Sequence, residues 1–232
     1  AWMIMIIQAG QSGRGIEFAA RWGELWFMSN PTLSRASENY AQVKTAVEAA
    51  GRDPSQVKIA NLTFPVVGRT MSEAEDRRAA YDLLPNLIDD LSLLSEGLNF
   101  DFSGKELDDP LSAEDVAAMT GIQGIRNQVI EVTGKDTPTL RDFVNVSGRG
   151  RLAHPVVGGP TELADYFEEW FTTPACDGFV IAGTHMPGAF QDFVDLVVPE
   201  LQRRGLFRTQ YSGNTLRDHL GLTQPIPGAW RR

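Results

Sequence analysis

The chain has 232 residues, enough to bury one large core or two small ones. Its composition, with 42% hydrophobic and 22% charged residues, is that of an ordinary soluble globular protein. The net charge of -9 argues against a nucleic-acid-binding surface, because 30 acidic residues outnumber 21 basic ones. The lone Cys176 excludes an internal disulfide and a zinc–thiolate cluster, and no apolar stretch is long enough to span a bilayer. We therefore expect a cytoplasmic protein that binds neither nucleic acid nor a membrane.

The first fifteen residues carry the strongest local pattern. An apolar run over 3–9 predicts a buried parallel strand, and a helical pattern begins at Ile16. Between them, residues 10–15 supply three glycines, the hydroxyl of Ser12 and the cation of Arg14. Free backbone N–H groups beside the positive end of a helix suit a phosphate, and glycines let a ligand approach closely. The spacing is equally that of a plain strand-to-helix connection.

The chain enters this strand almost at once, after Ala1 and Trp2. A buried strand seldom begins a domain so abruptly. We therefore expect a fragment whose N-terminal partner is missing or is supplied by another chain.

Three strand–helix units in sequence predict a parallel sheet. We expect a helix over 16–22 with Phe18, Ala19 and Trp22 toward the core, and a second strand over 24–27. A longer helix follows over 33–50, and a third strand runs over 57–64, with Pro65 near its close.

A long insertion region, 68–152, comes next. Ser72 is expected to cap a helix that Pro85 kinks or breaks, Ser112 to cap another, and 139–146 to form a third. In α/β barrels such insertions often build the mouth of a site.

The final unit begins with a helix at Pro160, followed by a fourth strand over 177–181. A last helix over 190–204 should bend at Pro199, and 206–232 reads as an extended C-terminal arm.

Several motifs, in order along nearly the whole chain, resemble the luciferase-like flavin-dependent monooxygenases. The similarity is closest to the branch with nitrilotriacetate monooxygenase component A, dibenzothiophene-sulfone monooxygenase and long-chain alkane monooxygenase. The motifs are Gln8-Ala9-Gly10-Gln11-Ser12-Gly13, Pro65-Val66-Val67-Gly68-Arg69-Thr70, Gly159-Pro160, Asp177-Gly178-Phe179, the run 198–205, and Leu220-Gly221-Leu222.

The resemblance implies a TIM (β/α)₈ barrel that uses reduced FMN and dioxygen to oxygenate a small organic substrate. The partner it implies is a separate flavin reductase that supplies the reduced FMN. The oxygenating species of such enzymes is a flavin hydroperoxide, while the protein positions flavin and substrate and excludes water. By the same resemblance, Ser12 and Gly13 contact the FMN phosphate, with Gln11 and Arg14 beside them.

The four strand–helix units match only the second half of that barrel, about strands 5–8 of eight. The chain, 1–232, then reads as the C-terminal half of a single barrel domain. Half a barrel leaves open sheet edges and an exposed apolar interior, which favours a homo-oligomer or pairing with a missing N-terminal half. The alternative function is a catalytically inactive half-barrel that acts as an oligomeric binding or interaction module. A different phosphate-binding α/β barrel is a further alternative, disfavoured by the order of the motifs.

Histidines are the remaining candidates for chemistry. The resemblance places His154 on the substrate side of the flavin, where a neutral imidazole would hydrogen-bond an oxygen; a solvent-exposed loop histidine is the alternative. His185 and His219 read as a loop residue and a structural residue. Glu24 and Asp177 are expected to face solvent or to cap, and Arg149 and Arg151 to lie in a solvated loop. No metal-ligand spacing appears.

Overall fold

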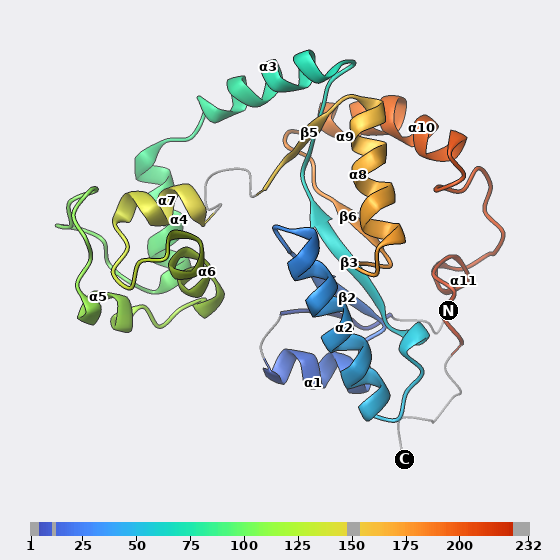
Figure 1. Ribbon diagram of the computed structural model, residues 1–232, viewed down its shortest axis with the longest axis horizontal. Helices are drawn as coiled ribbons and strands as arrows, with labels where there is room; N and C mark the ends of the chain where they lie inside the picture. Colours follow the sequence, from blue (N-terminus) through green and yellow to red (C-terminus); the bar gives the residue numbers. More distant parts are fainter. Residues whose placement is uncertain (1–4, 11–12, 148–153, 225–232) are drawn as a thin grey trace. The chain divides into compact units, whose positions relative to one another are not determined.

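The computed structural model describes residues 5–10, 13–147 and 154–224. It divides into two compact units (Figure 1). The sheet unit comprises Ala1–Ala74 and Val156–Arg232, and the helical unit is Glu75–Pro155. None of the helices in the described ranges has the length and apolar character needed to cross a membrane.

A four-stranded parallel sheet forms the centre of the sheet unit (Figure 1). Its strands lie in the order in which they occur along the chain: β1 (Ile7–Ala9), β2 (Leu25–Met28), β3 (Lys58–Thr63) and β6 (Gly178–Ile181). The predicted α/β class and parallel sheet are confirmed. Because every strand runs the same way, all the carboxyl ends lie at one edge of the sheet and all the amino ends at the other.

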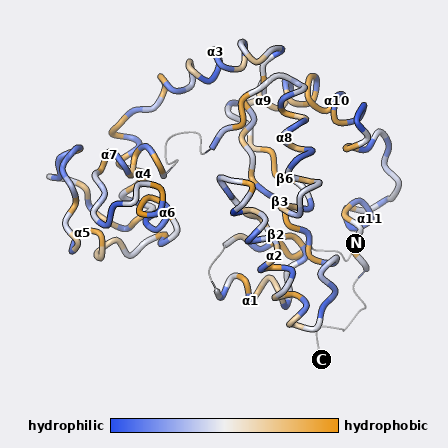
Figure 2. Tube along the Cα trace, viewed as in Figure 1, coloured by the Kyte–Doolittle hydropathy of each residue, from blue (hydrophilic) through white to orange (hydrophobic). Residues whose placement is uncertain are grey.

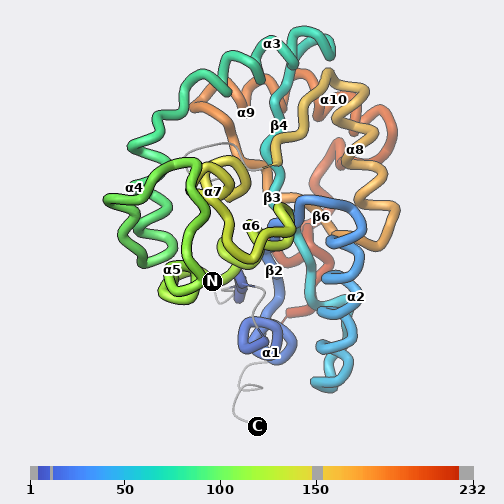
Figure 3. Tube along the Cα trace, turned by 60° about the vertical axis from the view of Figure 1, so that its left-hand side comes forward, coloured from blue at the N-terminus to red at the C-terminus, as the bar shows by residue number. Residues whose placement is uncertain are grey.

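A second sheet of two parallel strands escaped prediction. It pairs β4 (Pro65–Val67) with β5 (Val156–Gly158), and β4 continues the line of β3 after Phe64 (Figure 3). We expected Pro65 to close the third strand, but it opens the next one, a position where its missing N–H costs little. Strands of three residues are too short to show an alternating pattern.

Helices cover one face of the main sheet. They are α1 (Gly13–Trp22), α2 (Leu33–Ala49), α8 (Pro160–Thr172), α9 (Gly188–Asp192) and α10 (Val198–Arg203), with a 3₁₀ turn η1 (Pro54–Gln56) and a π-helical turn η2 (Phe193–Val197). Trp26 and Ile59 of the strands pack in one cluster with Val43 and Val47 of α2. Phe179 of β6 packs with Phe167 of α8 in another.

The opposite face of the sheet carries mainly apolar side chains that lie outside the described apolar clusters. The register places Ile7 beside Leu25, and Leu62 beside Val180. These side chains alternate along the strands with those that face the helices. None of them belongs to an apolar cluster of the described chain, and Ile7 is 56% exposed. Parallel sheets normally have both faces covered.

Helix α1 buries a different face from the one predicted. Ala19 is fully buried as expected, but Phe18 and Trp22 are 46% and 48% exposed. The buried positions are the small residues Gly15, Ala19 and Ala20. Small side chains allow the helix to approach its neighbours closely, which leaves the two large rings pointing away.

The helical unit has its own core. Its helices are α4 (Leu87–Leu98), α5 (Ala113–Ala118), α6 (Gln123–Thr133) and α7 (Leu140–Val146), and apolar residues recur along each of them (Figure 2). Leu94, Met119, Val129 and Phe143 are buried together at its centre. Ser112 and Thr139 cap α5 and α7 through reciprocal hydrogen bonds with the residue three positions on, which explains why these helices begin there.

Helix α3 (Met71–Asp82) begins earlier than expected, because its cap is Thr70 rather than Ser72. The amide of Glu73 donates to Oγ1 of Thr70 at 3.2 Å, and the Glu73 carboxylate accepts from the Arg69 amide. The chain breaks between α3 and α4 around Pro85, as predicted.

The C-terminal helix and arm differ in detail from the expected bent helix and extended tail. The π-helical turn η2 lies just before Pro199, which has no N–H to donate to the carbonyl of Asp195. The arm contains a short helix, α11 (Leu216–His219), capped by Thr215.

Helix α11 supplies the partner of Glu24, a residue that we expected to face solvent or to cap. Arg217, only 3% exposed, donates from Nη1 to Glu24 Oε2 at 3.0 Å, and its Nη2 binds the other carboxylate oxygen. The Arg217 Nε donates to the carbonyl of Thr223, and the Ile6 amide donates to Glu24. Burial alone would raise the pKa of Glu24, but the hydrogen bonds from Arg217 and Ile6 lower it below its usual value.

Asp177 is likewise a bridging residue rather than a solvent-facing one. Its Oδ2 accepts from Lys44 Nζ and from the Ile59 amide, both at 2.9 Å, and its Oδ1 accepts from the Tyr40 hydroxyl at 3.0 Å. Lys44 also donates to the carbonyl of Val57 at 2.7 Å. One carboxylate thus ties α2 to the amino ends of β3 and β6.

We predict that Arg217→Ala lowers the free energy of unfolding by about 3 kcal/mol, because it leaves the buried Glu24 carboxylate without its cation. Arg35→Ala is the matched control, since Arg35 forms an exposed ion pair with Glu38 that is worth at most about 1 kcal/mol. Urea unfolding at pH 7 measures both. Equal losses in the two variants would contradict a special role for the buried pair.

The same pair makes stability depend on pH. Because folding lowers the pKa of Glu24, its contribution is complete above its ordinary value of 4.5 and is lost as the pH falls through the lowered value. We predict that Glu24→Gln is less stable than the parent chain at pH 7 and that the difference shrinks below about pH 4. A difference that stays constant from pH 7 to pH 3 would show that ionisation of Glu24 does not contribute.

Candidate functional site

The turn between β1 and α1 is built on glycines that the backbone requires. Gly10 has a φ of +126°, a conformation that other residues rarely adopt. A side chain on Gly15 would place its Cβ only 2.7 Å from the Gly10 carbonyl oxygen. The end of β1 and the start of α1 therefore lie so close together that a side chain at position 15 would clash.

Gly13 and Arg14 differ from these two positions. Gly13 begins α1, and a Cβ built on it would meet no atom within 4 Å. The amides of the first residues of a helix point out of its N-terminal end, where anions bind. Arg14 is exposed on the same turn. Two further predicted phosphate contacts, Gln11 and Ser12, lie outside the described residues.

A buried amide network lies where β2 and β3 end. Asn39 Nδ2 of α2 donates to Asn30 Oδ1 at 2.6 Å, and both the backbone amide and Nδ2 of Asn30 donate to Asn61 Oδ1, at 3.0 and 3.2 Å. The sequence indicated only a turn at Asn30, because the three residues lie in different elements. The network fixes the chain as it leaves β2, at the same edge of the sheet as the glycine turn.

His154 lies in the helical unit, two residues before β5. It is a non-glycine residue with a φ of +46°, and its Nε2 lies 3.0 Å from Nε2 of Gln128 on α6. Although the residue as a whole is exposed, burial around the ring lowers the pKa of the imidazole. Sequence reasoning singled out His154 but gave no signal for Gln128, which is 26 residues away.

The other candidate residues are less suited to a catalytic role. His185 Nδ1 lies 3.2 Å from the Thr184 hydroxyl, and a Cβ on Gly188 would come within 2.6 Å of the His185 ring. Burial raises the pKa of the Cys176 thiol to about 12, so it is a poor nucleophile. Arg149 and Arg151 lie outside the described residues. Among the described side chains, no group of three His, Cys, Asp or Glu residues is arranged to hold a metal ion.

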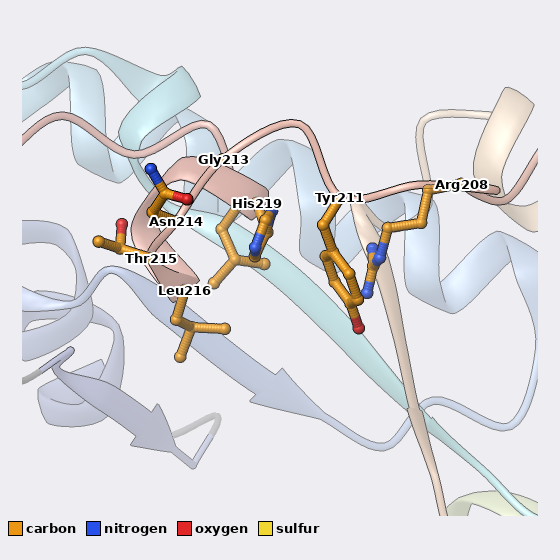
Figure 4. Close-up of a pocket in the computed structure, with 8 residues that line it drawn as sticks. Arg208, Tyr211, Gly213, Asn214, Thr215, Leu216 and His219 are labelled. Atoms are coloured by element: carbon orange, nitrogen blue, oxygen red, sulfur yellow. The ribbon is translucent and has the colours of Figure 1, made fainter.

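A hollow of about 560 Å³ lies in the C-terminal arm (Figure 4). The Arg208 guanidinium lies 4.8 Å from the centre of the Tyr211 ring, and that ring is 4.6 Å from the ring of His219. The neighbouring Arg217 reaches Glu24 at the amino end of β2. The arm is thus attached to the amino edge of the sheet, opposite the edge that carries the glycine turn, and barrel sites lie at the carboxyl edge.

Comparison with known proteins identifies the family to which the chain is similar. The sequence profile of the family described as luciferase-like monooxygenase matches residues 4–173. Nitrilotriacetate monooxygenase component A of Aminobacter aminovorans is 38% identical over 226 residues, which are 95% of this chain and 49% of the relative. The chain spans about half the length of the curated relatives it matches.

Two solved structures extend the similarity. DmoA from Hyphomicrobium sulfonivorans is 32% identical with a TM-score of 0.76 over 93% of this chain and 45% of its own. The riboflavin lyase RcaE, solved with a modified FMN and riboflavin, is 26% identical with a TM-score of 0.75 over 97% of this chain and 50% of its own. The resemblance read from the motifs is confirmed, and the chain belongs to the luciferase-like monooxygenase family.

Proposed function

We propose that this chain is the C-terminal half of an FMN-dependent monooxygenase barrel, which uses reduced FMN and dioxygen to oxygenate a small organic substrate. The observation that carries the proposal is the glycine turn after β1. It combines a required Gly10, a tight Gly15 and the open Gly13 at the carboxyl edge of a parallel sheet. This is the edge at which barrel enzymes hold their ligands.

The sheet supports the barrel. Its strands follow one another in chain order, helices cover one face, and the other face is mainly apolar, with Ile7 exposed on it. A closed barrel places such a face in its interior, and adjacent strands complete both edges. In this assignment β1, β2, β3 and β6 are barrel strands 5–8, and 68–152 is an insertion between two of them.

The turn fits an FMN phosphate. The amide of Gly13 at the start of α1 would bind the phosphate oxygens together with Ser12, with Gln11 and Arg14 beside them. The space that a Cβ of Gly13 would occupy is open, so a ligand can approach the backbone there. The relative RcaE, solved with a modified FMN, supports a flavin as the ligand.

His154 would act on the substrate side. The Val156 amide, two residues further along the chain, donates to the carbonyl of Phe64, just past the carboxyl end of β3. The neutral imidazole favoured by the lowered pKa would donate one hydrogen bond to an oxygen of the substrate or the flavin. Bound FMN supplies the reactivity with dioxygen, and this chain supplies binding, orientation and that donor.

The partners follow from the family. A separate flavin reductase would deliver the reduced FMN, and the enzyme would work in the cytoplasm. The names of the relatives support an oxygenation reaction, because one of them is nitrilotriacetate monooxygenase component A. Membership of the family also decides against a different phosphate-binding barrel.

The uncovered sheet favours one alternative. Ile7, Phe18 and Trp22 are exposed near the β1 edge, and α1 packs against β1. Such a surface favours a homo-oligomer or a missing N-terminal half. If self-association alone were its use, the chain would be an inactive half-barrel that serves as an oligomeric interaction module.

We predict that the chain binds reduced FMN and that Gly13→Asp weakens this binding about 100-fold. A carboxylate about 6 Å from the phosphate, at an effective dielectric constant of about 20, costs about 2.8 kcal/mol. The fold should tolerate the change, because the position is open and an acid is favourable in a first helical turn. Anaerobic FMN titration measures the affinity.

Gly13→Asn is the matched control, with the same size and no charge, and it should bind within a few-fold of the parent. Equal affinity of all three chains would remove the phosphate assignment. A parent chain that binds no FMN but forms a discrete oligomer, by light scattering, would favour the interaction module.

We predict that, in the complete enzyme, His154→Asn leaves the affinity for reduced FMN within about twofold but slows substrate oxygenation by about 100-fold, as expected for loss of a positioned proton donor. Asparagine suits the test because it tolerates the positive φ of this position. Comparing product formed with hydrogen peroxide released, per oxygen consumed, measures the effect. Unchanged coupled turnover would return His154 to the solvent-exposed alternative.

A further inference from the structure

Gln128 is anchored where it can direct the ring of His154. It lies in α6 beside Val129, which is fully buried in the core of the helical unit, and three residues after the buried Ile125. The Gln128 side chain is therefore carried by a fixed stretch of helix. The backbone of His154 is in the left-handed region, with a φ of +46°. The two Nε2 atoms are 3.0 Å apart.

The orientation of the Gln128 amide in the structure selects one form of the His154 ring. The amide turns its Nε2, a hydrogen-bond donor, toward the ring, so the facing Nε2 of His154 accepts in this arrangement. A neutral imidazole that accepts at Nε2 carries its proton on Nδ1. A cationic ring would present an N–H to the amide N–H, which is unfavourable. Among the described residues, no acceptor for Nδ1 of His154 is found.

We propose that Gln128 is a positioning residue that holds His154 neutral, with its proton on Nδ1. The Nδ1–H is then the donor offered to the substrate or the flavin, a role that rests on the proposed function. Burial around the ring acts in the same direction, because it disfavours the charged imidazole.

Two substitutions at Gln128 test whether its hydrogen bond to His154, and not merely a side chain of this size, controls the ring. Gln128→Glu has the same shape, but its carboxylate can only accept, so it should move the proton of His154 to Nε2 and raise the pKa of the ring by about one unit or more. Gln128→Leu removes the bond and should leave a mixture of the two neutral forms. Asn127→Asp is the matched control, since it adds the same charge one residue away on α6 without facing His154.

The measurement is two-dimensional ¹⁵N NMR of the histidine rings of the chain across a pH titration. The chain has 3 histidines, and His154→Asn identifies the signals of His154 by their loss. We expect the Nδ1–H form in the parent chain and in Asn127→Asp, the Nε2–H form in Gln128→Glu, and a mixture in Gln128→Leu. Chemical shifts report the proton position directly, so a loss of folding would be visible in the same spectra.

The proposal is overturned if the parent chain shows the Nε2–H form, or if Gln128→Glu titrates like Asn127→Asp. Neither result depends on flavin, so the test stands apart from the FMN titration. Failure of FMN binding would remove the proposed function and leave the control of the ring by Gln128 intact.

Discussion

The structure depends on the direction of its strands. Because β1, β2, β3 and β6 are parallel, every connection must carry the chain back across a helix, and this separates two edges of different character. All strands begin at one edge and end at the other. The helices that make the return cover one face only, so the turn after β1 and the ends of β2 and β3 are gathered at a single edge.

Partly buried ion pairs are concentrated at the edge where the strands begin. Glu24 precedes β2 and binds Arg217, while Asp177 precedes β6 and binds Lys44 and the start of β3. Arg52 donates to the carbonyl of Gly23 at the same edge. The groups described at the carboxyl edge are uncharged. They are the glycine turn, the Asn30 network and the backbone at the start of β5. A ligand at that edge meets backbone donors, with no fixed carboxylate among these groups.

Local patterns in the sequence predicted the parts that local physics determines. The strand–helix units, the cap at Ser112 and the break at Pro85 depend on residues within a few positions of one another. The ion pairs Glu24–Arg217 and Asp177–Lys44 at the amino edge were missed because their partners are 193 and 133 residues apart in the sequence. Nothing local distinguishes a paired carboxylate from a solvated one. Phe18 and Trp22 were assigned to the core because large rings usually are buried, whereas tight packing here selected Ala19 and Gly15.

The open face of the sheet connects assembly to the proposed chemistry. The glycine turn follows β1, which is an edge strand of the described sheet and bears the exposed Ile7. Whatever covers this face and pairs with this edge would also form a wall beside the turn. In the proposed barrel that cover is the N-terminal half, and in an oligomer it is a second copy. Phosphate recognition can reside in α1 alone, but exclusion of water from the flavin requires the cover, so binding and oxygenation have different structural requirements.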